Sequence, residues 1–189
     1  METKYEVIPI FSTPLYYNKI PEEVYNPNII NLENEPFSKS NDNFSKNTYI
    51  LNQDIYNNFS KYIIQHVTNF AENILCYAYK NYKFSQSWVS LKYPTQGHEQ
   101  HTHVYSLISG IFFWEDYHDS SNKLNFHKFN FNGNHYSIEH HPHHSDKLTN
   151  PFSSTFFPVL PKKGDLFLFS SNLNHSVPFN NTNFVRKSL

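Results

Sequence analysis

The stretch LISGIFFW, residues 107–114, is apolar on both faces that an extended chain would present, and so is LFLF at residues 166–169. Strands of this kind are covered on both sides, as they are in a closed barrel or in two packed sheets. Apolar or alternating patterns predict strands at residues 87–93, 105–115, 123–130, 154–160, 165–170 and 183–188. We therefore expect a mainly β fold after residue 86.

The part of the chain before residue 86 combines a predicted helix with less regular segments. Residues 54–80 carry apolar side chains every three or four positions and contain neither Gly nor Pro, which predicts an amphipathic helix lying against a sheet. Residues 5–17 resemble an edge strand, because prolines interrupt an apolar run. Residues 19–48 indicate surface loop, and a short strand is predicted at 48–51.

Composition limits the classes of partner. Aromatic residues make up 18% of the chain, which favours strands, and the formal net charge is -1, which gives no electrostatic footprint for nucleic acid or anionic lipid. The single cysteine, Cys76, excludes an internal disulfide and is expected to be buried and unreactive on the predicted helix. The N-terminus lacks the pattern of a signal peptide, and no apolar run could span a bilayer. We expect a cytoplasmic protein with no membrane or nucleic-acid partner, and a homodimer is left open.

Eight of the 12 histidines form three groups: His98, His101 and His103 in GHEQHTH, the tract EHHPHH at residues 139–144, and His175. In an extended segment, His101 and His103 point to the same side and could share one metal ion. Spacing alone does not decide, because the EHHPHH tract contains a second His-x-His pair. We interpret that tract as a surface loop that can chelate metal adventitiously.

The surroundings favour the first pair as a site. It lies between two predicted strands, and strand ends at the mouth of a β-barrel are common ligand sites. His175 follows another predicted strand, and Arg186 lies eleven positions further on. A guanidinium on a neighbouring strand could hold the far carboxylate of a dicarboxylate ligand while histidines hold a metal.

From Trp88 to the C-terminus the sequence resembles the 2-oxoglutarate- and Fe(II)-dependent oxygenase superfamily, and most of all a group of short oxygenases from marine bacteria and tailed phages. The matching features are Trp88, Tyr93-x3-Gly97-x3-His101-x-His103, Ser106-x2-Ser109-Gly110-Ile-Phe-Phe113, Pro161-x2-Gly164-Asp165-Leu-Phe-Leu-Phe169, His175 and Arg186. The opening PIFSTPLYY, residues 9–17, and the predicted helix are also similar to that group, so the resemblance covers nearly the whole chain.

The resemblance implies a double-stranded β-helix, the jelly-roll or cupin-like fold, with an N-terminal helix. It implies a single domain over residues 1–189, in which residues 1–85 support a β-helix core at 86–189. It further implies that His101 and His175 bind Fe(II), that Arg186 pairs with the distal carboxylate of 2-oxoglutarate, and that Tyr93 hydrogen-bonds this cosubstrate. The reaction would be a hydroxylase-type dioxygenation, in which 2-oxoglutarate is oxidatively decarboxylated with dioxygen while an unknown protein side chain or small molecule is oxidised.

One position departs from the superfamily pattern, because His103 stands where the usual triad has a carboxylate. His103 could be a third metal ligand, Glu99 or Glu115 could supply the missing carboxylate, or the position could lie beside the metal without binding it. The first alternative is preferred, since relatives with His-x-His look similar here.

Two other functions remain open. A three-histidine, cupin-like dioxygenase could bind iron and its substrate without 2-oxoglutarate. A jelly roll could also serve as a metal-stabilised binding or structural module, because the fold does not determine the function. Arg186 favours the 2-oxoglutarate enzyme, since the dioxygenase without a cosubstrate has no second carboxylate to anchor there.

Overall fold

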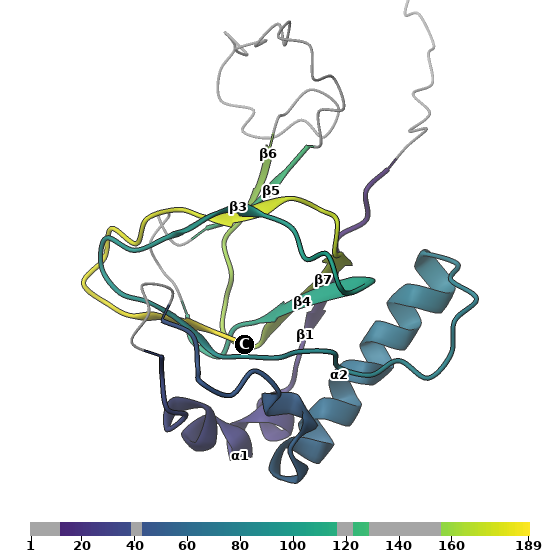
Figure 1. Cartoon of the computed structure of the whole chain (residues 1–189), viewed down its shortest axis with the longest axis horizontal. Coiled ribbons are helices and arrows are strands. Elements are labelled where there is room, and N and C mark those ends of the chain that lie inside the picture. The colour runs from purple at the N-terminus through teal and green to yellow at the C-terminus, as the bar shows by residue number, and fades with distance from the viewer. Residues whose placement is uncertain (1–11, 39–42, 117–122, 129–155) are drawn as a thin grey trace, which may run out of the picture.

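The computed structural model describes residues 12–38, 43–116, 123–128 and 156–189, which form mainly β-sheet with few helices (Figure 1). The N-terminal elements are β1 (Tyr16–Lys19), α1 (Glu22–Glu33), two 3-10 turns (Ile50–Asn52 and Asp54–Tyr56), α2 (Asn57–Asn69) and a π-helical turn (Phe70–Ile74). The strands that follow are β2 (Ser90–Lys92), β3 (His98–His101), β4 (Ile108–Phe112), β5 (Leu124–His127), β6 (Phe156–Val159), β7 (Asp165–Ser170), β8 (His175–Val177) and β9 (Arg186–Ser188).

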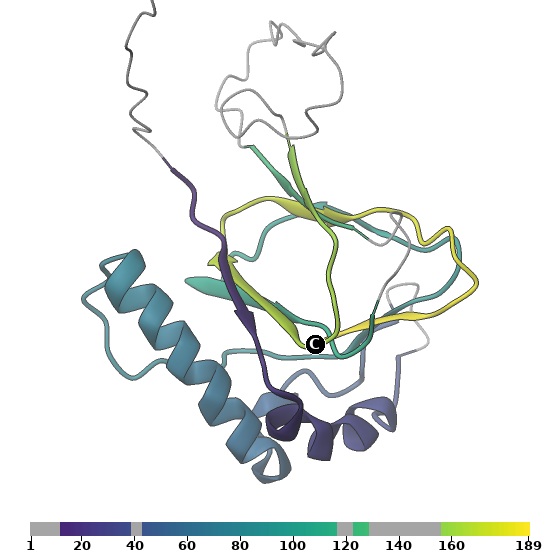
Figure 2. The same cartoon turned by 180° about the vertical axis from the view of Figure 1, so that it is seen from behind.

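The strands of the described residues pair antiparallel in three sheets, with the orders β1-β7-β4, β2-β9 and β3-β8-β5-β6. The four-stranded sheet lies across from the three-stranded one, and α1 and α2 lie beyond the three-stranded sheet (Figure 1). Seen from behind, β1 leads directly into α1, so the chain passes from this sheet into the helical layer (Figure 2).

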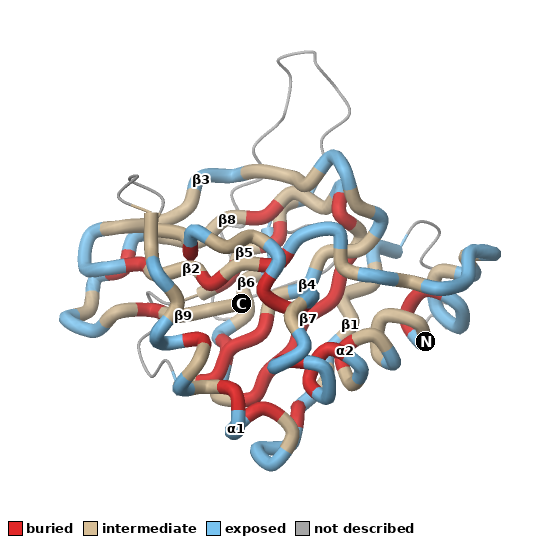
Figure 3. The backbone as a smooth tube through the Cα atoms, turned by 60° about the horizontal axis from the view of Figure 1, so that its bottom comes forward, coloured by how far each residue is buried: buried red, intermediate tan, exposed pale blue. Residues whose placement is uncertain are grey.

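Strand β7 is covered on both faces, as its sequence LFLF predicts. Leu166 and Leu168 belong to a core that includes residues of α1 and α2, whereas Phe167 and Phe169 belong to a second core with Phe126 of β5. Side chains alternate across a strand, so one apolar run supplies both cores. Buried residues accordingly run along β7 and continue toward the helices (Figure 3).

The predicted strands after residue 86 are present with shorter bounds in β2, β4, β5, β6 and β9, and β7 has the predicted bounds. Two strands were not predicted, β3 and β8. Both are three or four residues long and rich in polar side chains, so neither has the apolar alternation by which a strand is recognised.

The N-terminal predictions need three corrections. Residues 19–48 are not all loop, because α1 forms there and buries Tyr25 and Leu32, which lie on one face of the helix. The strand predicted at 48–51 is wrong, since residues 50–52 form a 3-10 turn. Burial of a few large side chains overrides weak local propensity in both segments.

The predicted helix at 54–80 is shorter than its apolar pattern. Regular α-helix spans 57–69, and the π-helical turn ends at Ile74. Cys76 follows with a φ of 54°, a left-handed conformation that stops a helix. Its side chain is exposed, so the prediction of a buried cysteine is wrong.

Two expectations fall outside the described residues. The edge strand predicted at 5–17 is described only from residue 12, and its last two residues begin β1, which among the described strands pairs with β7. The EHHPHH tract at 139–144 lies wholly outside them. No helix in the described part has the length and apolar character that crossing a membrane requires.

Candidate metal centre

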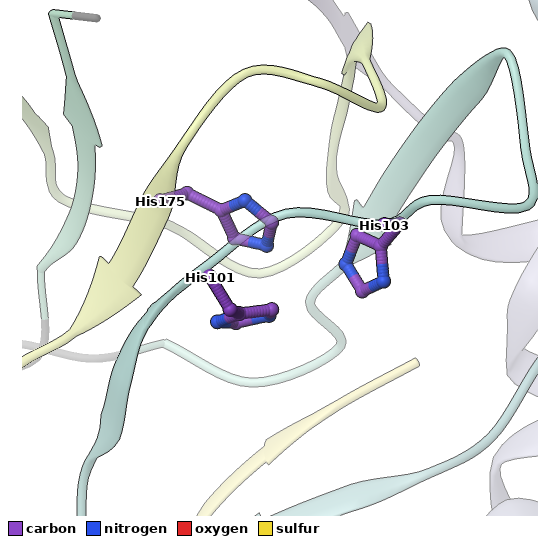
Figure 4. Close-up of side chains that lie close together, drawn as sticks. All are labelled: His101, His103 and His175. Atoms are coloured by element: carbon purple, nitrogen blue, oxygen red, sulfur yellow. The ribbon is translucent and has the colours of Figure 1, made fainter. Parts of the chain in front are cut away.

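Three histidines predicted from the sequence lie together (Figure 4). His101 ends β3, His175 begins β8, and the two residues are direct partners in the antiparallel pairing of these strands. Cross-strand partners project to the same side of a sheet, so their rings meet. His103 follows two residues after His101, and one ring nitrogen from each histidine lies within 4.8 Å of the other two.

The ring nitrogens that could bind metal are identified by the backbone. The Nδ1 of His101 lies 2.8 Å from the carbonyl oxygen of Glu99, and the Nδ1 of His175 lies 3.0 Å from that of Leu173. A carbonyl can only accept, so each Nδ1 carries the hydrogen and each Nε2 keeps its lone pair. Ligating histidines are held and oriented by this kind of bond.

Burial keeps two of the histidines neutral. His175 is only 2% exposed, and burial lowers its pKa to about 3, although the bond to Leu173 acts in the opposite direction. Burial also lowers the pKa of His103, and the neighbouring His101 lowers it further. Because metal binds the neutral imidazole, protons do not compete for these two side chains near pH 7.

Aromatic rings surround the cluster. The ring of Phe169 lies 4.9 Å from that of His175 on one side, and Phe126 lies 6.4 Å away on another. Trp88 lies 6.0 Å from the ring of His103. These ring contacts restrict the rotamers of His103 and His175.

A cavity of about 1020 Å³ contains all three histidines and Arg186 in its wall. It extends to α2, where Ile63, Ile64 and Val67 line it. Its volume is typical of a site for a small organic ligand.

Arg186 reaches the cavity from a strand pair that has two different faces. In the β2–β9 register, Lys92 is opposite Arg186 and Ser90 is opposite Ser188, and all four residues line the cavity. The residue between them in β9, Lys187, points the other way and pairs with Glu33 and Glu115 at 2.8 and 2.9 Å. One face of this pair is therefore a wall of cations and hydroxyls.

The guanidinium itself is held deep in the protein. Arg186 is 3% exposed, its Nη1 donates to the carbonyl oxygen of Lys123 at 3.0 Å, and its Cζ lies 5.4 Å from the ring centroid of Phe113. It is also the single arginine among the 15 basic residues of the chain. A guanidinium group that is already held in place loses little conformational entropy when it binds a carboxylate.

The remaining predicted residues are placed differently. Tyr93 follows β2, is 43% exposed and is not among the residues that line the cavity. Glu99 is exposed, and Glu115 is engaged by Lys187. Among the described residues, the histidine cluster contains no carboxylate.

Sequence reasoning missed two residues of the cavity wall. Lys92 is buried and lines the cavity. Because side chains alternate between the two faces of a strand, Lys92 faces the cavity and the next residue, Tyr93, does not. His98, to which the sequence pattern assigned no role, lines the cavity and stacks on His101 with ring centroids 4.0 Å apart. The alternation of β2 could have indicated Lys92, whereas only the pairing of β3 with β8 brings His98 inward.

Comparison with known proteins identifies the family. Residues 86–189, more than half of the chain, match the model of the family described as "Putative 2OG-Fe(II) oxygenase". The chain belongs to this family. A search of curated protein sequences found no match.

Among solved structures, this oxygenase-family chain is similar to a prolyl-4-hydroxylase from Pseudomonas putida, with a TM-score of 0.59 and 11% sequence identity. The similarity covers 94% of this chain and 90% of the other. At this identity the similarity shows a shared fold.

Proposed function

We propose that this protein is a 2-oxoglutarate- and Fe(II)-dependent dioxygenase of the hydroxylase type, built on a double-stranded β-helix. The observation that carries the proposal is that His101, His103, His175 and Arg186 line one cavity. Family membership supports the reaction class, and a cavity that extends beyond these residues to α2 is large enough for a second, prime substrate.

The donor set fits an iron site. His101 and His175 offer Nε2 atoms whose rings are fixed by backbone carbonyls, and His103 is neutral near pH 7. Imidazole is a suitable ligand for iron and also for zinc, copper and nickel. When bound, Fe(II) would supply the dioxygen chemistry that oxidises an unactivated C–H bond.

His103 is proposed as the third ligand, in place of the usual carboxylate. Neither Glu99 nor Glu115 belongs to the cluster, and Glu115 already pairs with Lys187. An all-imidazole site is more positive than one with a carboxylate, so it favours an anionic cosubstrate on the metal.

Arg186 would hold the distal carboxylate of 2-oxoglutarate. Its buried fork can grip a carboxylate bidentately, and Ser188 stands two residues on along the same face with a hydroxyl that can donate to the same oxygens. Tyr93 would take part by turning its ring inward from the end of β2. The chain's own residues thus bind the cosubstrate, orient it and keep water away.

The family-matched core and the residues before it are proposed to form one domain over residues 1–189. Two other expectations stay predictions: a protein side chain or small molecule as prime substrate, and a cytoplasmic location. The choice between monomer and homodimer stays open.

The deciding experiment is an anaerobic titration of Fe(II) and 2-oxoglutarate into metal-stripped protein, followed by the visible charge-transfer band of the chelated cosubstrate. The band should form in wild type and disappear in His175→Ala. Arg186→Met should require much more 2-oxoglutarate to reach the same band. Lys187→Met is the matched control, because this neighbouring cation faces away from the cavity and should leave the titration unchanged.

The alternatives give other results. Binding of Fe(II) without a band would indicate a three-histidine dioxygenase that needs no 2-oxoglutarate. Binding of zinc alone, or of no metal, would indicate a binding or structural module.

A further inference from the structure

Ser171, directly after β7, is 1% exposed and bonds through its backbone to the loop that leads from His103 to β4. Its N–H donates to the carbonyl oxygen of Leu107 at 3.1 Å, and its carbonyl oxygen accepts from the N–H of His103 at 2.9 Å. Both ends of the loop are therefore attached to one residue.

The hydroxyl of Ser171 adds one bond to this loop and one to the second residue of β4. Its Oγ lies 2.7 Å from the Oγ of Ser106 and 2.8 Å from the Oγ of Ser109. A hydroxyl can donate once and accept twice, so Ser171 can satisfy both partners at once. These hydroxyls belong to the framework around the histidines, since Ser106 and Ser109 line the cavity.

The loop has little packing of its own to hold it. Val104 and Tyr105, the residues that follow His103, are 76% and 94% exposed. Loops with few buried contacts open at low free-energy cost. The position of His103 therefore depends on the hydrogen bonds that Ser171 makes.

Ser171 also begins the segment that carries the opposite histidine. Four residues later the chain reaches His175, whose Nδ1 is held by Leu173, and the N–H of Leu173 is bonded to Ser170. Ser171 is thus the point at which the His103 loop and the His175 segment are joined.

We propose that Ser171 is a positioning residue that fixes His103 against His175 and so completes the three-histidine metal site. This inference rests on the proposed metal site and adds a determinant of its geometry. Removing the hydroxyl should leave the fold intact, because the two backbone bonds remain. It should loosen the middle of the loop at Ser106, and with it the orientation of the His103 side chain.

Cobalt(II) titrated into the metal-stripped full chain is the test, because its visible absorption reports the number and arrangement of ligands. The signal lost in His175→Ala defines the site and separates it from binding to the EHHPHH tract. Ser171→Ala should raise the cobalt Kd by up to about 10-fold, the lower end of the range for losing a partner bonded directly to a ligand, because this hydroxyl acts through the loop. Its absorption should shift toward that of His103→Ala, and Ser171→Thr should restore part of the affinity.

Two comparisons separate positioning from general destabilisation. Ser60→Ala removes another buried serine hydroxyl, which donates to Leu51 in the helical layer, and should leave the cobalt Kd unchanged. In a His103→Ala background, Ser171→Ala should cause no further loss, because a residue that acts through His103 has nothing left to position.

The outcomes distinguish the two proposals. If wild type lacks the cobalt site, the metal centre and the role of Ser171 both fail. If wild type binds and Ser171→Ala binds equally well, or if the loss persists undiminished without His103, the metal centre stands and the role of Ser171 is refuted.

Discussion

His175 is the least exposed of the clustered histidines, and its ring is fixed by Leu173 on one side and by Phe169 on another. His103 has a more exposed position and is held through the loop bonds to Ser171. A ligand that is already oriented loses less entropy on binding, so the two residues should contribute unequally to metal affinity.

Loss of a partner that orients a metal ligand typically raises the Kd about 10- to 100-fold. We therefore predict that His175→Ala, which removes a ligand itself, raises the Kd for Fe(II) by more than this. His103→Ala should raise the Kd for Fe(II) by less than His175→Ala does. Equilibrium dialysis with Fe(II) under anaerobic conditions measures both affinities. Equal losses in the two variants would show that burial does not rank the ligands.

Gly97 and Gly110 offer a matched pair of substitutions next to the site. A Cβ at Gly97 would lie 2.7 Å from the carbonyl oxygen of Val177, whereas one at Gly110 would lie 2.8 Å from a methyl group of Leu168. A side chain can turn aside, but the paired backbone of β8 cannot. Gly97→Ala should therefore lower the free energy of unfolding by about 1–3 kcal/mol, more than Gly110→Ala.

Urea unfolding of both glycine variants tests this ranking. Gly97→Ala should also weaken metal binding, because it pushes β3 away from β8 and separates His101 from His175. A larger loss of stability in Gly110→Ala would contradict the prediction.

At the scale of elements, the contact between β1 and α2 depends on a half-buried histidine. The hydroxyl of Tyr16 lies 2.8 Å from the Nδ1 of His66, and burial lowers the pKa of His66 below its ordinary value of 6.5. The unfolded chain then binds the proton more readily than the folded one. This contribution to stability is complete above about pH 6.5 and is lost as the pH falls below it.

We predict that the free energy of unfolding falls between pH 7.5 and pH 5 more steeply in metal-stripped wild type than in His66→Gln. Urea unfolding across that range measures both slopes, and the difference between them removes the contribution of every other histidine. Identical slopes would mean that His66 titrates alike in the folded and unfolded states.

At the scale of the whole molecule, the larger core is shared between the two parts of the chain. Its buried members before residue 86 include Tyr25, Phe59 and Phe70, and those after it include Phe112 and Leu168. Strand β1 completes the sheet of β4 and β7, and Lys187 of β9 pairs with Glu33 of α1. The family-matched region thus depends on the residues that precede it.

A fragment of residues 86–189 should therefore not fold alone, although it spans the family match. The fragment would expose one side of the larger core to water. Burial of apolar side chains is the main stabilising contribution to a domain of this size, so the fragment would lose much of its stability. Amide NMR spectra and far-ultraviolet circular dichroism of the fragment, compared with those of the full chain, measure the loss of folded structure. Dispersed amide signals from the fragment would show that residues 1–85 are dispensable.

Much of the β fold could be predicted because its signals are local. LFLF at 166–169 is apolar on both faces whatever surrounds it, and β7 has the predicted bounds. The cluster of His101, His103 and His175 was predicted as well, since the spacing of the first two is a property of an extended segment and the resemblance supplied the third. Their role as ligands remains a proposal.

The features that sequence could not give depend on partners distant in the chain. The short strand β8 pairs with both β3 and β5, and its pairing with β3 sets His101 opposite His175 and turns His98 inward. Helix α1 forms in a segment of weak propensity because a core receives Tyr25 and Leu32. Local patterns of side chains determined the apolar strands such as β4 and β7, whereas only tertiary packing, through pairing register and burial, decided the polar strands and which side chains share the cavity.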